Sequence, residues 1–230
     1  MRSYLILGRR SVMSILVAVV LLLFAVLCFR APGPDPETVV QLAQTGLAEA
    51  TSYRFRLSVR TVIDRRDNMV SKIVGEFTQP DCYHLQGSSY DFKLDLYHKD
   101  GELTFLDPAN NQWKKSTAAP SLVTEAVLFT TSPIVDFLTA QNFNLISCKR
   151  DKGKKVYHFY TELDEITYSY WEIFFSDFKL ESFVNYPDCQ VQQLRLYGTN
   201  KEQEDTLLIE LVFTDYNQPI EMIFPDEVDK

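Results

Sequence analysis

The clearest pattern in the chain is an alternation of apolar and polar side chains over residues 53–63. Successive side chains of a β-strand point to opposite faces, so this period of two predicts a strand with one buried face and one solvent face. The apolar face consists of Tyr53, Phe55, Leu57, Val59, Thr61 and Ile63, and the other face consists of Arg54, Arg56, Ser58, Arg60 and Val62.

Segments with similar patterns predict further strands along the chain. Tight turns such as Lys99-Asp100-Gly101 join them, which indicates antiparallel pairing. The expected strands cover residues 70–78, 82–88, 92–98, 102–107, 112–115, 143–149, 154–161, 167–176, 179–186, 189–198, 206–214 and 219–223. A sheet of this many strands must curl or close rather than lie flat.

Two regions have helical spacing instead. Asp35-Pro36 supplies an N-cap residue and a first-turn proline for a helix over residues 36–50. After Pro120, the apolar spacing predicts two helical segments, the second of which restarts at Ser132-Pro133. Because these helices are the available cover for the apolar face of the sheet, the pattern predicts an α+β, mainly β domain. Its strongly curved antiparallel sheet carries short helices on the concave face.

An apolar segment precedes this domain. Val12–Phe29 contains eighteen residues without a charge, which is long enough to cross a bilayer as a helix. Three arginines (Arg2, Arg9 and Arg10) precede it, so the positive-inside rule places the N-terminus in the cytoplasm. We therefore expect a single-pass protein of the cell membrane with an extracytoplasmic C-terminal domain. Cleavage as a signal peptide, or lipidation at Cys28, stays open as an alternative.

The expected organisation has three parts. Residues 1–30 form a cytoplasmic stub and transmembrane anchor, or an uncleaved signal. Residues 31–34 (Ala-Pro-Gly-Pro) form a stiff linker, and residues 35–230 form one extracytoplasmic domain.

Composition and charge narrow the function. The 230 residues are 46% apolar and 13% aromatic, which excludes a wholly disordered chain. The net charge is −8, and all 31 acidic residues follow the apolar segment. A dominant basic footprint for nucleic acid is therefore absent, and we expect no nucleic-acid partner.

The sequence carries no motif for catalysis or metal binding. It has no nucleophile elbow, metalloprotease motif, phosphate-binding loop or dinucleotide fingerprint. Its histidines (His84, His98 and His158) do not have the spacing of metal ligands. We therefore expect a protein that is not an enzyme, with no cofactor and no metal.

Three cysteines follow the apolar segment: Cys82, Cys148 and Cys189. Cys82 and Cys189 each end a Pro-Asp-Cys turn, and a simple meander would bring both turns to one end of the sheet. An oxidising compartment then permits a disulfide between them. The alternative is that all three thiols are unpaired.

Arg54, Arg56 and Arg60 share one strand face and form a candidate docking patch for anionic head groups or an envelope partner. The simpler interpretation is that they are solvent-facing strand residues.

Three stretches resemble the LolA/LppX-like superfamily, which comprises periplasmic lipoprotein carriers and their actinobacterial and firmicute relatives. They are the helix running into TSYRFRLSV, the hairpin GELTFLDPANNQW, and DYNQPIEMIFP, which is similar to the closing strand of that superfamily. The resemblance implies a bacterial cell-envelope protein with an incomplete antiparallel barrel. It also implies a cavity between sheet and helices that accepts acyl chains.

Such a hydrophobic cleft would be lined by alternate strand positions and by the helices above them. The candidates are Phe55, Leu57, Phe92, Leu94, Leu96, Phe105, Val127, Phe137, Leu138, Trp171 and Ile173. The alternative is that all of them belong to an ordinary closed core, because apolar periodicity reports burial and not a ligand.

Together these features predict a membrane-tethered, extracytoplasmic, non-catalytic binding protein for a lipid or an acylated molecule. The alternative function is a protein-interaction or envelope-sensor module on the same fold.

Overall fold

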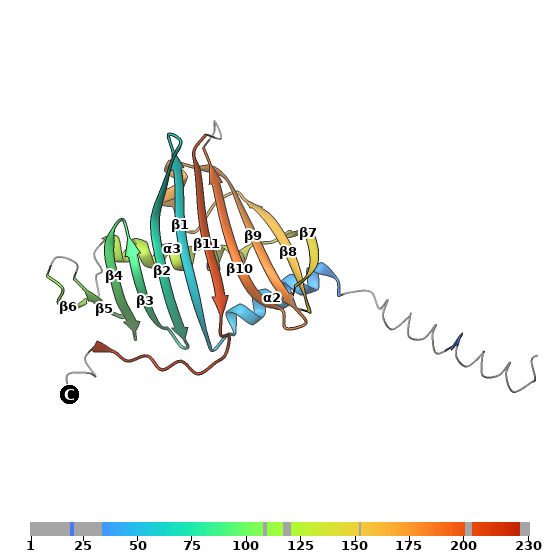
Figure 1. Ribbon diagram of the computed structural model, residues 1–230, viewed down its shortest axis with the longest axis horizontal. Helices are drawn as coiled ribbons and strands as arrows, with labels where there is room; N and C mark the ends of the chain where they lie inside the picture. The colour runs from blue at the N-terminus through green and yellow to red at the C-terminus, as the bar shows by residue number, and fades with distance from the viewer. Residues whose placement is uncertain are drawn as a thin grey trace, which may run out of the picture. The chain divides into compact units, whose positions relative to one another are not determined.

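The computed structural model describes residues 19–20, 34–107, 110–116, 121–151, 153–200 and 204–225. Within these residues, eleven strands form one antiparallel sheet with two α-helices beside it (Figure 1). The elements are α2 (Pro36–Ala48), β1 (Ser52–Ile63), β2 (Arg66–Thr78), β3 (Cys82–Ser89), β4 (Phe92–Lys99), β5 (Glu102–Leu106), β6 (Trp113–Ser116), α3 (Ser121–Thr139), β7 (Asn144–Asp151), β8 (Lys154–Leu163), the 3₁₀-helix η1 (Ser169–Ile173), β9 (Ser176–Tyr186), β10 (Gln190–Thr199) and β11 (Thr206–Thr214).

The sheet consists of two meanders joined at their first and last strands. Its order is β6-β5-β4-β3-β2-β1-β11-β10-β9-β8-β7, so the pairing of β1 with β11 lies at the centre. In this pairing, Phe55 is opposite Phe213 and Leu57 is opposite Leu211. The described strands leave β6 and β7 as edges, so the sheet is curved but not closed. The predicted fold class is confirmed.

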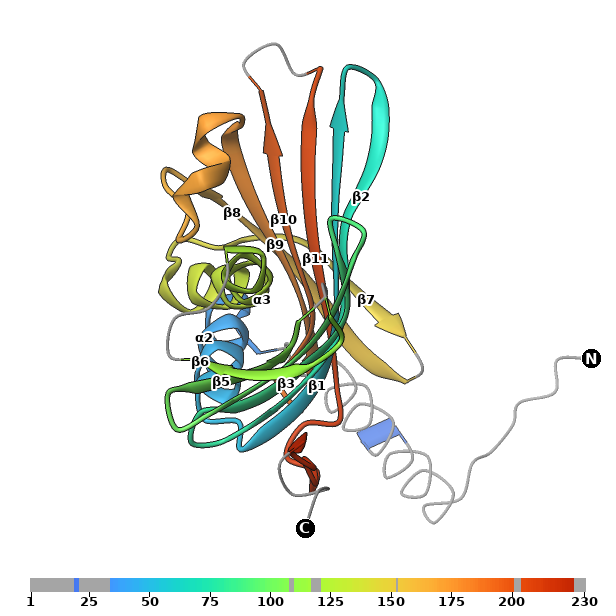
Figure 2. The ribbon, with the colours of Figure 1, turned by 90° about the vertical axis from the view of Figure 1, so that its left-hand side faces the viewer.

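Both helices lie on one face of the sheet, and the sheet curves around them (Figure 2). α2 and α3 pack on β9 and β10, and α3 also packs on β11. The alternation predicted for residues 53–63 is confirmed in β1, whose residues Phe55, Leu57 and Val59 are buried against this layer. Arg56 and Arg60 are exposed on the opposite, convex face.

The chain divides into two compact units, Met1–Asp35 and Pro36–Lys230. Among the described residues, the second unit contains all the strands and the hydrophobic core. The predicted membrane segment Val12–Phe29 lies outside the described residues except for Val19 and Val20. Among the described residues, none belongs to a helix that is long and apolar enough to span a membrane.

The expected helix restart at Pro133 is wrong, because α3 is continuous and Pro133 lies inside it. Proline removes only one backbone donor from the helix interior. The hydroxyls of Thr130 and Thr131 also bond to the carbonyls four residues earlier, at 3.0 and 3.1 Å, which adds polar contacts in this turn. Buried packing then outweighs the helix-breaking tendency.

The strand predicted at residues 167–176 is also wrong. This segment contains η1, and β9 begins only at Ser176. The amide N–H of Thr167 donates to Asp136 Oδ1 at 2.8 Å, and that of Tyr168 donates to Ser132 Oγ at 3.2 Å. These amides are therefore used by side chains of α3 and not by a neighbouring strand.

The closing strand expected at residues 219–223 is absent as well, although those residues are described. The segment after β11 instead runs along the ends of the strands towards β4 (Figure 1). Asn217 N–H donates to the Ser52 carbonyl at 2.8 Å, and the Ser52 hydroxyl donates to the Gln218 carbonyl at 2.6 Å. Pro219 has no N–H to donate to a strand.

Candidate binding groove beneath helix α3

An apolar groove of about 160 Å³ lies between α3 and the concave face of β1, β2 and β3. The sheet contributes aromatic and aliphatic side chains, and α3 contributes one flank. The lining residues are Tyr53, Phe55, Phe77, Asp81, Tyr83, Leu85, Val127, Thr130, Thr131, Ile134 and Val135.

The groove exists because the helices cover the two halves of the sheet unequally. α2 and α3 both pack on β9 and β10, whereas the groove lies between β1 to β3 and the flank of α3. Gly75 also shapes this space, because a methyl group at its position would lie 2.0 Å from Cζ of Phe55. The missing side chain of Gly75 lets the Phe55 ring lie flat against β2.

Polar atoms in the groove are few, and the threonines are satisfied within α3. Burial raises the pKa of Tyr53 to about 12. Burial, together with the nearby carboxylate of Asp81, raises the pKa of Tyr83 to about 12. Both phenols are therefore neutral at pH 7 and offer hydrogen bonds without charge.

The mouth of the groove is marked by its two most exposed lining residues, Asp81 and Val135. The Asp81 side chain is 65% exposed, and Val135 is 40% exposed. Asp81 lies in the turn between β2 and β3, and its carbonyl accepts a hydrogen bond from His98 Nδ1 at 3.0 Å. The His98 ring stacks on Tyr83 with centroids 4.6 Å apart. The mouth therefore has one carboxylate beside an aromatic pair.

Of the predicted cleft residues, the structure brings Phe55 and Val127 to the groove. Leu138 is half-buried and packs against the core. The others that are buried lie in the closed core: Leu57, Leu94, Leu96, Phe105, Phe137 and Trp171.

Two predicted cleft residues are outside the interior. Phe92, at the start of β4, is 51% exposed, because the face it shares with Leu94 and Leu96 is not covered at this end of the strand. Ile173 is 72% exposed, because the segment around it forms η1 and loses the expected alternation.

Sequence reasoning missed most of the groove. Tyr53 shares the alternation that identified Phe55, and Leu85 and Tyr83 follow the same rule in β3, so their inward direction was readable. The groove residues of α3 could not be identified from the sequence, because the direction in which α3 crosses the sheet depends on packing over β9 to β11.

A buried carboxylate holds the segment before η1 against α3. Asp136 is 4% exposed, and its Oδ1 accepts hydrogen bonds from the Thr167 N–H at 2.8 Å and the Thr167 hydroxyl at 2.5 Å. Its Oδ2 accepts from Ser132 Oγ at 3.3 Å. Burial raises the pKa of Asp136, although these hydrogen bonds oppose the shift. We call this arrangement the Asp136 clamp.

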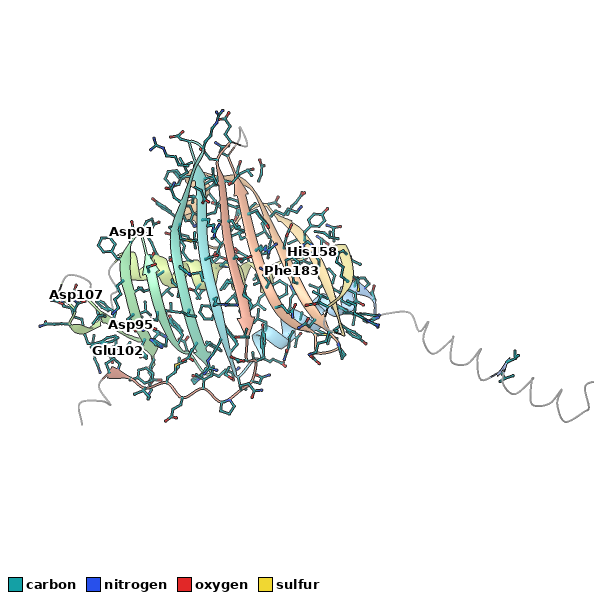
Figure 3. The ribbon with its side chains drawn as sticks, in the orientation of Figure 1. Asp91, Asp95, Glu102, Asp107, His158 and Phe183 are labelled. Atoms are coloured by element: carbon teal, nitrogen blue, oxygen red, sulfur yellow. The ribbon has the colours of Figure 1, made fainter. Side chains whose placement is uncertain are left out.

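A larger hollow of about 740 Å³ lies beside η1, and its lining includes the acidic residues Glu162, Asp164 and Glu172. The described residues contain no cluster of His, Cys, Asp or Glu that is suited to hold a metal ion. His84 in β3 hydrogen-bonds to Asp95 at 2.9 Å, and His158 in β8 hydrogen-bonds to Glu181 at 3.1 Å. Asp95 and His158 lie on the sheet (Figure 3).

The candidate docking patch lies on the convex face, away from the groove. Arg54 forms ion pairs with Glu76 at 2.7 Å and Asp215 at 3.3 Å. Arg56 and Arg60 are exposed on the same strand.

Of the two alternatives for the cysteines, the structure has the unpaired one: Cys82, Cys148 and Cys189 are all free thiols, and the possible Cys82–Cys189 disulfide is not formed. Both turns lie at the same end of the sheet, as a meander requires, but β2, β1 and β11 lie between β3 and β10. Four strand spacings correspond to about 19 Å along the sheet. A disulfide needs a Cα separation below about 7 Å.

The fold expected from the resemblance is shared with two solved structures. The lipoprotein LppX of Mycobacterium tuberculosis is similar with a TM-score of 0.51 and 9% identity, covering 81% of this chain and 99% of LppX. LprF of Mycobacterium bovis is similar with a TM-score of 0.55 and 10% identity, covering 84% of this chain and 98% of LprF. No protein-family model and no curated protein matches the sequence.

Proposed function

We propose that this protein binds the acyl chain of a lipid or an acylated protein in the groove beneath α3, outside the cytoplasm and without catalysing a reaction. The observation that carries the proposal is the apolar groove, which is lined mainly by aromatic and aliphatic side chains. Ligand sites are typically concave, mostly apolar and supplied with few polar groups. The chain shares its fold with the lipoprotein LppX.

The size of the groove sets what it can hold at rest. An apolar cavity of roughly 150 Å³ accommodates a benzene-sized molecule. At about 160 Å³, the groove takes a short terminal portion of an acyl chain. A longer chain requires α3 to move away from β1 to β3.

The tether is part of the proposal. Val12–Phe29 would hold the domain at a membrane. Because the arginines lie mostly before this segment, the domain after it would be on the extracytoplasmic side. A tethered domain would receive or present a lipid at short range, because the linker after Phe29 is only a few residues long.

Native mass spectrometry of residues 34–230, produced in a bacterial periplasm, tests the proposal. We expect an added mass that organic solvent releases as a lipid, or uptake of an added fatty alcohol. Thr131→Trp fills the groove and should abolish uptake. Thr139→Trp places the same side chain at an exposed position of α3 and should leave uptake intact. A domain that takes up no amphiphile, or equal uptake by the two variants, would refute lipid binding in this groove.

A protein-interaction module is the second candidate. The convex face favours it, since Arg56 and Arg60 lie near the exposed apolar side chains Val74 and Met69, a combination typical of interfaces. Cross-linking from a photoreactive residue at Val74 in cells would test it. Capture of one defined partner, lost in the Arg56→Ser and Arg60→Ser double variant, would favour this function over lipid binding.

A further inference from the structure

The charge at the groove is negative and comes from Asp81. Among the described residues that line it, Asp81 is the only carboxylate, and none is a lysine or an arginine. The phenols of Tyr53 and Tyr83 are neutral at pH 7, since their pKa values are about 12. When α3 moves to admit a whole chain, the polar end of the amphiphile therefore meets a carboxylate at the mouth.

The Asp81 carboxylate is available to such a group. His98 Nδ1 gives its proton to the Asp81 carbonyl at 3.0 Å and is 3.5 Å from the carboxylate Oδ2. Nearby cations are engaged elsewhere: Arg54 is ion-paired on the convex face, and the Lys99 ammonium lies over the Phe224 ring at 4.8 Å. The carboxylate side chain stays largely exposed, so an incoming head group can reach it.

We propose that the groove selects amphiphiles whose polar end is cationic or a neutral hydrogen-bond donor, such as an amine or a hydroxyl, over those ending in a carboxylate or phosphate. This selectivity rests on the proposed function, since it presumes that the apolar chain occupies the groove. An ammonium group is attracted to Asp81 and a carboxylate is repelled. At an exposed site each effect is a factor of a few, so their product is roughly three- to tenfold in affinity.

The test compares three ligands with the same twelve-carbon chain: dodecylamine, dodecanol and dodecanoate. Residues 34–230 are used after a single cooperative unfolding transition has been verified, and affinities are measured by calorimetry at pH 7. Binding that remains in Thr131→Trp is subtracted as surface binding. We expect the amine to bind tightest and the carboxylate weakest, with a spread of roughly three- to tenfold that shrinks at high salt.

Two variants with the same change in net charge locate the effect. Asp81→Asn should remove the spread between the amine and the carboxylate. Asp91→Asn, at the β3–β4 turn near the opposite end of these strands, should retain it (Figure 3). Asp91 has a left-handed backbone, with φ of 65°, which asparagine also adopts, so the control is not expected to disturb the turn.

The outcomes separate the two proposals. Equal affinities, tighter carboxylate binding, or a spread unchanged in Asp81→Asn would overturn the selectivity and leave lipid binding standing. Absence of groove binding by all three ligands would overturn lipid binding and the selectivity with it.

Discussion

The Asp136 clamp gives the sharpest test of how the layer above the sheet is held. Replacing Asp136 with alanine removes the acceptor for two hydrogen bonds from Thr167 and one from Ser132. A hydrogen bond to a charged group contributes roughly 1.5–3 kcal/mol, but Thr167 is exposed and water can replace part of what it loses. Ser132 also keeps its bond from the Tyr168 amide. We therefore expect Asp136→Ala to lower the free energy of unfolding by about 1–2 kcal/mol.

Asp136→Asn is the matched control. Its amide oxygen can accept both bonds from Thr167, and its NH₂ group can donate to Ser132 Oγ. It also removes the cost of burying a charge, so its free energy of unfolding should lie within about 0.5 kcal/mol of the native value, or above it. Urea unfolding followed by tryptophan fluorescence gives both values. Hydrogen exchange at the Thr167 amide should become roughly tenfold faster in Asp136→Ala, which corresponds to 1.4 kcal/mol.

The pH dependence follows from the raised pKa of Asp136. The folded state holds the proton to a higher pH than the unfolded state, whose value is near 3.8. At a pH between the unfolded-state and folded-state pKa values, the folded state binds more protons at Asp136 than the unfolded state does. The contribution of Asp136 to the free energy of unfolding therefore falls as the pH rises through this range, and it does not change with pH above both pKa values. Asp136→Asn removes that slope. If Asp136→Asn destabilises as much as Asp136→Ala, or if neither changes stability, the clamp does not work in this way.

Three further substitutions test the packing. Ser182→Ala should raise the free energy of unfolding by about 1 kcal/mol, because Ser182 Oγ is buried without a partner among the described residues. A lower free energy of unfolding, measured with urea, would contradict this. Gly75→Ala should lower the free energy of unfolding by about 1–3 kcal/mol and change the affinity for dodecanol, because the new methyl group collides with the Phe55 ring. If stability and affinity are both unchanged, the Phe55 ring moves freely and the reasoning is wrong. Trp171→Phe should lower the free energy of unfolding by at most about 1–2 kcal/mol, because it also removes a buried N–H that has no partner among the described residues. Trp171→Ala should lower it by about 3–5 kcal/mol, and equal losses in the two variants would contradict this reasoning.

The strand pattern was readable from the sequence because burial on one face leaves a local signature. The alternation over residues 53–63 predicts β1 correctly, and Asp35-Pro36 predicts the start of α2 at Pro36. The errors arise where distant residues decide. Thr167 and Tyr168 lie in a segment whose side chains favour a strand. Their amides nevertheless donate hydrogen bonds to Asp136 and Ser132 of α3, which are over 30 positions away in the sequence.

The groove was predictable in kind but not in place. Period-two patterns identify which side chains face inward, and Phe55 was found in this way. They do not identify which part of the inward face the helices leave uncovered. That depends on α2 and α3 packing together over β9 and β10, a choice set by side-chain volumes across the whole layer.

Helix α3 must serve two opposing requirements if the groove accepts a chain. Its C-terminal half is fixed by polar contacts, since Gln44 Nε2 donates to the Phe137 and Ala140 carbonyls at 2.8 and 3.1 Å and Asp136 accepts from Thr167. Its other half carries Val127 and Thr131 along the groove. Pro133 lies between the two, where one backbone hydrogen bond is missing. Bending at this position would move Val127 and Thr131 relative to β1 to β3, while the bonds of Asp136 to Thr167 and of Gln44 to the C-terminal half of α3 stay in place. On the proposed function, the unequal cover of the sheet would allow one helix both to close the core and to admit a ligand.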